Sequence, residues 1–269
     1  QRIDFSMVSI SVVDATAGSL QIDPTASRII NGDLAAEQEF RHAVSIQLKN
    51  NVQNTRGHIC GGVLISLSHV LSACSCLYRS NVLIVPAQYQ VFGGATALTN
   101  NTQPDRVRNI ASITTHPNYH GSPAFANDIA ILTVSYYTSS SIRLNLCMTS
   151  GRPVNLRYAV QYIYNHQVCA TLYSTLPAQP NILDSMLCAS SYTMNTGGCD
   201  SDRGNALVCD GVLTGLLSVS SNCQSIVRPE IYTKIANYNT WIKSVTGASS
   251  IILPGTLIVA LMTALPAFL

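Results

Sequence analysis

A loop that starts at Cys199 holds the densest group of reactive side chains in the sequence, in the order Asp200, Ser201, Asp202 and Arg203. Nucleophilic catalysis needs a hydroxyl or thiol activated by a nearby base, which a third group orients. Arg203 cannot be that nucleophile, because a guanidinium stays protonated in a protein and cannot attack a carbonyl carbon. The loop therefore places a permanent cation beside one hydroxyl and two carboxylates.

The composition of the 269-residue chain favours a globular protein with a sizeable core, because 47% of its residues are hydrophobic and only 10% are charged. This length fits one large all-β domain or two small domains. The net charge is +2, and the basic residues are scattered. Clustered Lys and Arg are the usual sign of nucleic-acid binding, so we expect no nucleic-acid partner, and we expect no cofactor.

Nine cysteines predict disulfides and an oxidising compartment. The alternative is a zinc site, because Cys74 and Cys76 lie close together. Zinc sites favour two pairs of ligands with two to four residues inside each pair, and the sequence has no second pair of this kind. We therefore expect disulfides and no metal, with one thiol left over from the odd count.

The pattern of apolar residues divides the chain into three parts. Residues 1–28 are weakly patterned and read as a leader. From Ile29 to about Val227, short apolar runs alternate with Gly, Pro, Asn and Ser, which is typical of an all-β barrel or sandwich. Apolar residues at helical spacing from Ile231 to Ile242 predict a closing helix.

The third part, residues 247–269, contains an uncharged stretch from Ile251 to Leu269. A helix of 19 residues is long enough to cross a bilayer, and a plain tail is the simpler alternative. Small residues at 247–250 precede the stretch, as in a signal for GPI attachment. We expect an extracellular protein and favour a GPI signal over a spanning helix.

Five segments of the sequence resemble trypsin/chymotrypsin-type serine proteases, in the order of that family and over residues 28–246. The last segment resembles the nucleophile loop Cys-x-Gly-Asp-Ser-Gly-Gly-Pro-Leu-Val. The segments are Arg28-Ile29-Ile30-Asn31-Gly32, His58-Ile59-Cys60-Gly61-Gly62-Val63-Leu64-Ile65, Val70-Leu71-Ser72-Ala73-Cys74-Ser75-Cys76, Asn127-Asp128-Ile129-Ala130-Ile131-Leu132 and the loop from Gly198 to Cys209. The resemblance implies one protease domain over residues 29–246, built as two packed six-stranded antiparallel β-barrels with a C-terminal helix.

The resemblance also assigns the catalytic positions. It gives the carboxylate to Asp128, the imidazole position to Ser75 and the nucleophile position to Arg203. A serine hydroxyl cannot act as a base near neutral pH. The two backbone N–H groups of the oxyanion hole fall on Ser201 and Arg203, and both N–H groups remain. The sequence therefore predicts a degenerate triad.

The resemblance places the floor of the specificity pocket at Gly197, which carries no carboxylate, and the walls at Ser218, Val219 and Ser220. Glu230 falls on a position where the family usually has glycine. Our hypothesis is that Glu230 pairs with Arg203 or Arg228 and closes the pocket. The alternative is a solvated surface glutamate.

The sequence matches the activation switch of the family more closely than it matches the catalytic positions. The resemblance implies that cleavage after Arg28 frees the ammonium of Ile29, which then binds Asp202. Before cleavage, a histidine and a serine hold that aspartate, and these match His58 and Ser45. Because a buried charge needs a partner, we expect Asp202 to bind His58 or Ile29.

The resemblance pairs the cysteines as Cys60–Cys76, Cys147–Cys209, Cys169–Cys188 and Cys199–Cys223. It leaves Cys74, which we expect to be a buried small hydrophobic residue. Only one acidic residue, Asp105, lies between residues 77 and 126, so we expect no calcium there. Asn100 begins a glycosylation sequon.

These observations predict a secreted, non-catalytic protease homologue that binds a protein, such as a protease, an inhibitor or a cascade component. One alternative is an active secreted endopeptidase with an atypical site. Another alternative, based on residues 251–269, is a membrane-tethered surface binding protein.

Overall fold

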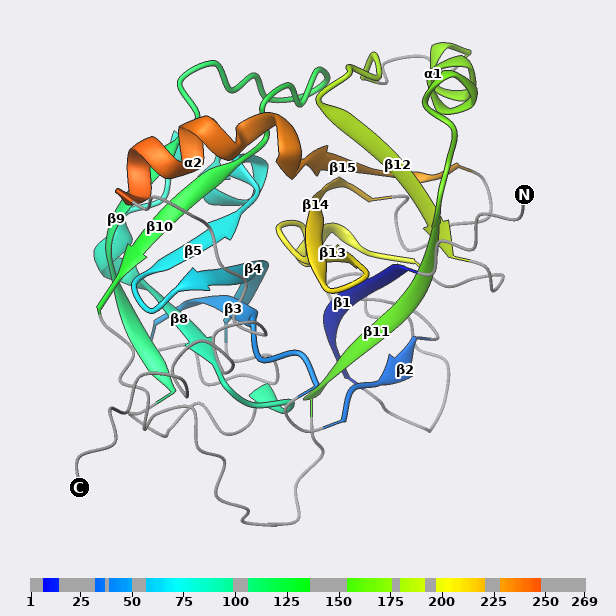
Figure 1. Cartoon of the computed structure of the whole chain (residues 1–269). Helices are drawn as coiled ribbons and strands as arrows, with labels where there is room; N and C mark the ends of the chain where they lie inside the picture. The colour runs from blue at the N-terminus through cyan, green and yellow to red at the C-terminus, as the bar shows by residue number, and fades with distance from the viewer. Residues whose placement is uncertain are drawn as a thin grey trace, which may run out of the picture.

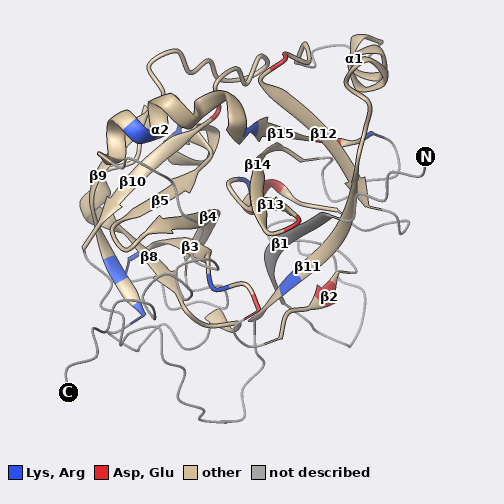
Figure 2. Ribbon diagram, in the orientation of Figure 1, with Lys and Arg blue, Asp and Glu red and all other residues tan. Residues whose placement is uncertain are grey.

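Two curved antiparallel β-sheets lie side by side, and helix α2 (Asn239–Thr246) packs against the first of them (Figure 1). The computed structural model describes residues 7–14, 32–36, 39–49, 57–98, 106–135, 154–175, 180–191, 197–220 and 228–247. The predicted all-β fold class is confirmed. Across the described residues, the Lys and Arg positions are scattered along the ribbon (Figure 2).

The first sheet is a closed barrel of six antiparallel strands in the order β10-β5-β4-β3-β8-β9. The side chains of a strand alternate between its two faces, and Ile46, Val70 and Leu132 are fully buried in the barrel core. The strands are β3 (Ala43–Leu48), β4 (His58–Ser66), β5 (His69–Ser72), β8 (Tyr89–Gly93), β9 (Val107–Thr115) and β10 (Ala130–Val134). A separate hairpin joins β6 (Tyr78–Arg79) to β7 (Val82–Leu83).

The second sheet has seven strands in the order β1-β13-β14-β15-β12-β11-β2, and β1 also pairs with β11. Leu207, Leu217 and Tyr232 are fully buried in its core. The strands are β1 (Met7–Asp14), β2 (Asp33–Leu34), β11 (Val154–Ile163), β12 (Met186–Ser191), β13 (Ala206–Cys209), β14 (Val212–Val219) and β15 (Glu230–Lys234).

Strand β1 differs from the leader that the sequence predicts over residues 1–28. Its backbone pairs with β11 from Met7 opposite Gln161 to Asp14 opposite Val154, and its first residues also pair with β13. The run Val-Ser-Ile-Ser-Val has the period of two that suits a strand. Backbone groups of β11 and β13 supply the hydrogen bonds that this short run needs in order to be ordered.

The closing helix is confirmed only from Asn239 onward. Ile231 and Tyr232 belong to β15, because they are fully buried and pair with strands β12 and β14 on either side. A 3-10 turn, η6 (Ile235–Tyr238), separates β15 from α2, and α2 ends at Gly247 with a φ of 67°. The other helical segments are η1 (Cys74–Leu77), η2 (Pro86–Gln88), α1 (His166–Ser174) and η5 (Asp200–Asp202).

An apolar cluster joins the two sheets and helix α2. It draws on β4, β5, β10, β13, β14 and α2, and therefore fixes the strand ends that carry the loops discussed below. Its buried members are Val63, Ile65, Leu71, Ile129, Ile131, Ala206, Leu213, Leu216, Ile235, Tyr238 and Ile242.

Candidate functional site

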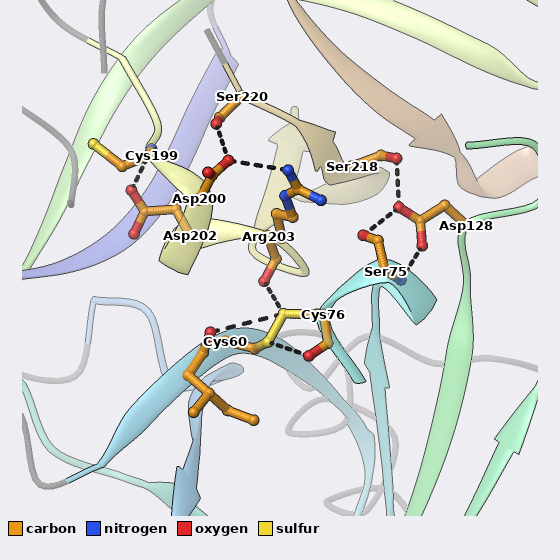
Figure 3. Close-up of polar contacts among 11 residues, drawn as sticks. Cys60, Ser75, Cys76, Asp128, Cys199, Asp200, Asp202, Arg203, Ser218 and Ser220 are labelled. Carbon is orange, nitrogen blue, oxygen red and sulfur yellow. Dashed lines mark hydrogen bonds and ion pairs between the residues drawn. A yellow bond between two sulfur atoms is a disulfide. The ribbon is translucent and has the colours of Figure 1, made fainter. Parts of the chain in front are cut away.

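Asp128 lies between the two sheets, two residues before β10 begins, and its side chain is fully buried. Its Oδ1 accepts a hydrogen bond from the Ser75 backbone N–H at 2.7 Å. Its Oδ2 accepts bonds from the hydroxyls of Ser75 at 2.7 Å and Ser218 at 2.5 Å (Figure 3). The structure thus brings together the predicted triad position Ser75, the predicted carboxylate and one predicted wall residue of the pocket.

Local structure explains this placement. Ser75 lies on the one-turn helix η1, which the Cys60–Cys76 disulfide ties to β4. Asn127 adopts a left-handed φ of 54°, and its side chain accepts a bond from the Tyr238 hydroxyl at 3.1 Å. Asp128 is therefore held by a rigid turn on one side and by η1 on the other.

Burial raises the pKa of Asp128 above its ordinary value, and the hydrogen bonds from Ser218 and Ser75 and the charge of Arg203 oppose that rise. Each side-chain group that contacts the carboxylate is a hydroxyl that donates a proton in a hydrogen bond. Hydroxyls remain protonated near neutral pH. This arrangement stabilises a buried carboxylate and gives it nothing basic to orient.

Arg203, at the predicted nucleophile position, follows η5. Its Nη2 lies 3.0 Å from Oδ1 of Asp200, and the same oxygen accepts the Ser220 hydroxyl at 2.9 Å. The guanidinium carbon lies 5.4 Å from the centre of the Phe125 ring, within the range of a cation–π contact. Arg203 is therefore held between the Phe125 loop and the second sheet, on the Asp200 side of the site (Figure 3).

The backbone N–H and carbonyl of Arg203 also already make hydrogen bonds within the protein. The Arg203 N–H donates to the Asp200 carbonyl at a long 3.4 Å, and the Arg203 carbonyl accepts from the Gly61 N–H at 2.9 Å. At this predicted oxyanion position the N–H group is present, but it already donates within its own loop. The cause is the tight 3-10 turn η5, which directs that N–H back into the loop.

Glu230, at the start of β15, is fully buried and lies at the predicted pocket. Its carboxylate accepts bonds from the Gly198 N–H, from the Tyr232 hydroxyl at 2.6 Å and from Gln161 Nε2 at 3.3 Å. The hypothesised pairing with Arg203 or Arg228 is wrong, and so is the solvated alternative. The carboxylate finds neutral donors inside the sheet, and burial raises its pKa.

The remaining predicted pocket positions lie on two segments of the second sheet and its loops. Gly197 is buried and directly precedes Gly198, which donates to Glu230. Ser218 and Val219 end β14, and Ser220 follows them. Ser218 and Ser220 are nearly inaccessible and donate to Asp128 and Asp200, respectively.

Two of the predicted switch residues, Ser45 and His58, are joined by hydrogen bonds to the loop that carries the third, Asp202. Ser45 Oγ lies 2.7 Å from Nδ1 of His58, and His58 Nε2 lies 3.1 Å from the Ser201 carbonyl. A carbonyl only accepts, so His58 carries its proton on Nε2. Asp202 is fully buried, and its Oδ2 accepts the Cys199 N–H at 2.8 Å. His58 thus contacts Ser45 and the residue before Asp202. Ile29 lies outside the described residues, and the binding of Asp202 by His58 or Ile29 stays a prediction.

Two predicted disulfides, Cys60–Cys76 and Cys169–Cys188, are present. Cys199 is also disulfide-bonded, and its predicted partner Cys223 lies outside the described residues. The Cys147–Cys209 prediction is contradicted at Cys209, which is a free thiol. Strand β1 pairs with β13 at this point, with Met7 opposite Cys209. Cys147 lies outside the described residues.

Cys74 is a buried thiol that donates to the Ile129 carbonyl at 2.9 Å. Burial raises its pKa to about 12, so the predicted inert role agrees with its environment. Arg28, Ile29, Asn100 and the stretch 251–269 lie outside the described residues. In the part of the chain that the structure describes, no helix is long and apolar enough to cross a membrane.

Four residues of the site were not predicted from the sequence: Asp200, Phe125, Gln161 and Tyr232. Asp200 could have been found, because it lies three residues before Arg203 on a turn and carries the opposite charge. Tyr232 shares a face of β15 with Glu230, as alternation along a strand implies. The contacts of Phe125 and Gln161 bridge distant parts of the chain, so no local signal marks them.

Comparisons with known proteins agree with this fold. The family model described as Trypsin matches residues 29–242. A chymotrypsin-like serine proteinase of Haliotis rufescens is 26% identical over 259 residues, which cover 87% of this chain and 98% of that protein. Trypsin of Sus scrofa is 28% identical, with 82% and 97% covered, and kallikrein-8 of Mus musculus is 30% identical, with 69% and 76% covered.

A solved structure of a serine protease has a similar fold. The structure of neuropsin, a serine protease expressed in the limbic system of mouse brain, superimposes with a TM-score of 0.62 at 27% identity. The superposition covers 81% of this chain and 100% of that chain. Because the family model spans most of the sequence and the two-sheet fold agrees with it, this chain belongs to the trypsin-like serine protease family.

Proposed function

We propose that this chain is a non-catalytic member of its family that acts by binding another protein. The observation that carries the proposal is the hydrogen bonding of Asp128, whose side-chain partners are the hydroxyls of Ser75 and Ser218. In the catalytic triad, the aspartate acts only through the imidazole that it orients. Here, a hydroxyl stands at the imidazole position and a guanidinium at the nucleophile position.

The partner that fits best is a protein of extracellular proteolysis, which this chain would serve as a regulator, cofactor or decoy. The described disulfides support an oxidising compartment. Trypsins, kallikreins and related proteinases are its relatives, which supports proteases, their inhibitors and cascade components as the class of partner. The buried Glu230 supports binding through the rim of the cleft over binding through a deep pocket.

Hydrolysis of a broad fluorogenic peptide library tests the proposal. The chain cleaved after Arg28 should hydrolyse no peptide above the buffer rate. The double variant S75H/R203S should gain weak activity at best, because Glu230 and the η5 turn remain. Hydrolysis by the wild-type chain that the D128N variant abolishes would establish the alternative, an active endopeptidase with an atypical site.

Binding is tested by a pull-down with the cleaved chain and the uncleavable R28A variant side by side. A partner that prefers one form would show that the switch of Asp202, His58 and Ser45 controls recognition. If neither form retains a protease, an inhibitor or a cascade component, the proposed binding role is overturned.

We also propose that residues 247–269 are a GPI signal that is removed from the mature protein. The support is the run of small residues followed by the uncharged stretch. A phosphatidylinositol-specific lipase should release the protein from expressing cells. Mature protein that still contains residues 251–269 would contradict the proposal.

A further inference from the structure

We infer that Arg203 and Ser220 form a binding site for a peptide carboxylate, and that Asp200 of the same chain occupies this site in the structure. The inference rests on the proposed function, because it names the chemical group that a protein partner presents to the cleft rim.

Two donors from separate loops converge on one oxygen atom. Arg203 Nη2 lies 3.0 Å from Asp200 Oδ1, and Ser220 Oγ lies 2.9 Å from the same oxygen (Figure 3). Arg203 follows η5, whereas Ser220 follows β14. A carboxylate oxygen at this point receives one charge-assisted bond and one hydroxyl bond, and an external carboxylate would receive the same pair.

The internal carboxylate is easier to displace than the cation. The Asp200 side chain is 59% exposed, whereas the Arg203 side chain is only 20% exposed. Exposed ion pairs contribute little to stability, because solvent competes for both charges. Asp200 can therefore turn outward into water while the Arg203 guanidinium stays against the Phe125 ring.

The guanidinium has a donor that Asp200 does not use. Arg203 Nε is buried and has no hydrogen-bond partner among the described residues. Arginine binds carboxylates most favourably through two parallel N–H bonds, but Asp200 contacts only Nη2. Because Nε is buried in this conformation, a ligand carboxylate could bond to both Nε and Nη2 only after Asp200 has turned away.

The geometry explains why Asp200 makes only one of these two bonds. Its carbonyl accepts the Arg203 N–H inside the turn η5, and its Oδ1 is shared with Ser220. These restraints limit how its carboxylate meets the guanidinium. A carboxylate on another chain has no such tether, and the Phe125 ring beside the guanidinium would help to keep Arg203 in place.

NMR titration with four capped peptides tests the site. The first pair is acetyl-tetra-alanine with a free C-terminal carboxylate and its C-terminal amide. The second pair is acetyl-Ala-Ala-Glu-Ala-amide and the same peptide with Gln, so that a terminal carboxylate is distinguished from a side-chain carboxylate. The wild-type chain should bind at least one carboxylate peptide more tightly than its neutral match.

Substitutions at Asp200 and Arg203 test whether these residues cause the preference for a carboxylate peptide. D200A removes the internal competitor and should tighten binding of the carboxylate peptide by about two- to fivefold, the range expected from an exposed ion pair. R203Q and D200A/R203Q should lose the preference for the carboxylate. R203K keeps the charge without the planar fork, and should bind more weakly than the wild-type chain.

Equal binding of carboxylate and neutral peptides by the wild-type chain would overturn the site, even if D200A failed to fold. So would an R203Q variant that stays folded and keeps the preference. These outcomes leave the hydrolysis result unchanged. Conversely, peptide hydrolysis by the wild-type chain would overturn the proposed function. The NMR titration would still decide whether the carboxylate site exists.

Discussion

At the scale of single residues, Asp128 keeps a complete set of donors although no imidazole contacts it. Three donors, two of them from Ser75, reach its carboxylate. Such bonds offset the cost of burying a charge. Asp128 is therefore explained by the packing of the two sheets, whether or not the site performs chemistry.

The S75A variant should lower the free energy of unfolding by about 1 kcal/mol, because it removes one donor from a buried carboxylate and leaves the backbone N–H and Ser218 in place. Urea denaturation measures the change. S244A, which truncates an exposed hydroxyl on α2, is a suitable control. Equal stability of S75A and the wild-type chain would mean that the Ser75 hydroxyl adds no net stability.

Burial raises the pKa of Glu230, so the folded chain binds this proton more readily than the unfolded chain. Stability therefore increases as the pH falls from above the folded pKa towards the unfolded value of about 4.3. The E230Q variant should show a smaller increase between pH 7 and pH 4.5 in urea midpoints. Asp128 shifts in the same direction, so some increase should remain. Identical profiles would contradict the assignment.

At the scale of elements, the turn after η5 packs closely against the first barrel. Gly204 has a φ of 84°, and a Cβ there would lie 2.3 Å from Ser72 Oγ and 2.5 Å from the Gly61 carbonyl oxygen. The Gly204 N–H also donates to the Leu217 carbonyl on β14. One residue thus joins the loop to strands of both sheets, and only glycine fits there.

The G204A variant should lose about 3 kcal/mol or more of stability, from left-handed strain and from steric overlap. The G211A variant is a matched control, because Gly211 has a similar φ of 76° with open space around its missing Cβ. It should lose only about 1 kcal/mol. Guanidinium denaturation of both variants measures the difference, and equal losses would show that the close contact at Gly204 is unimportant.

The elements also show what could be predicted from the sequence. The distance from Cys60 to Cys76 placed Ser75 correctly beside Asp128, because a short disulfide loop leaves little freedom. The contacts of Glu230 with Gly198 and Gln161 could not be predicted, since these residues come from distant parts of the chain and meet Glu230 only in the folded sheet. Strand β1 was missed, because its short run gains backbone partners only beside β11 and β13.

At the scale of the whole molecule, two sheets form one folded unit through a shared apolar cluster and through contacts of the Arg203 turn. The Cys60–Cys76 disulfide lies beside this junction. The fold class followed from motif order along the whole chain. The conformation of η5 did not, since it depends on the way the two sheets meet around it.

The C60A/C76A variant should lose about 3 kcal/mol of stability, the value expected when a loop of this length is no longer closed in the unfolded chain. Thermal unfolding of the variant and of the oxidised wild-type chain measures the loss. The C169A/C188A variant is the comparison, because the Cys169–Cys188 disulfide closes a loop of similar length and lies in a separate apolar cluster. A much larger loss for C60A/C76A would reveal an added contribution from η1.

The buried Glu230 has a practical consequence for purification. With glycine at position 197 and the Glu230 carboxylate bound to Gly198, the pocket offers no free anion to an amidine-bearing resin, so the chain should pass through such a column. Contaminating trypsins, which recognise basic groups, should remain on the resin. The burial of Glu230 thus supplies a way to remove active proteases before any trace of hydrolysis is measured.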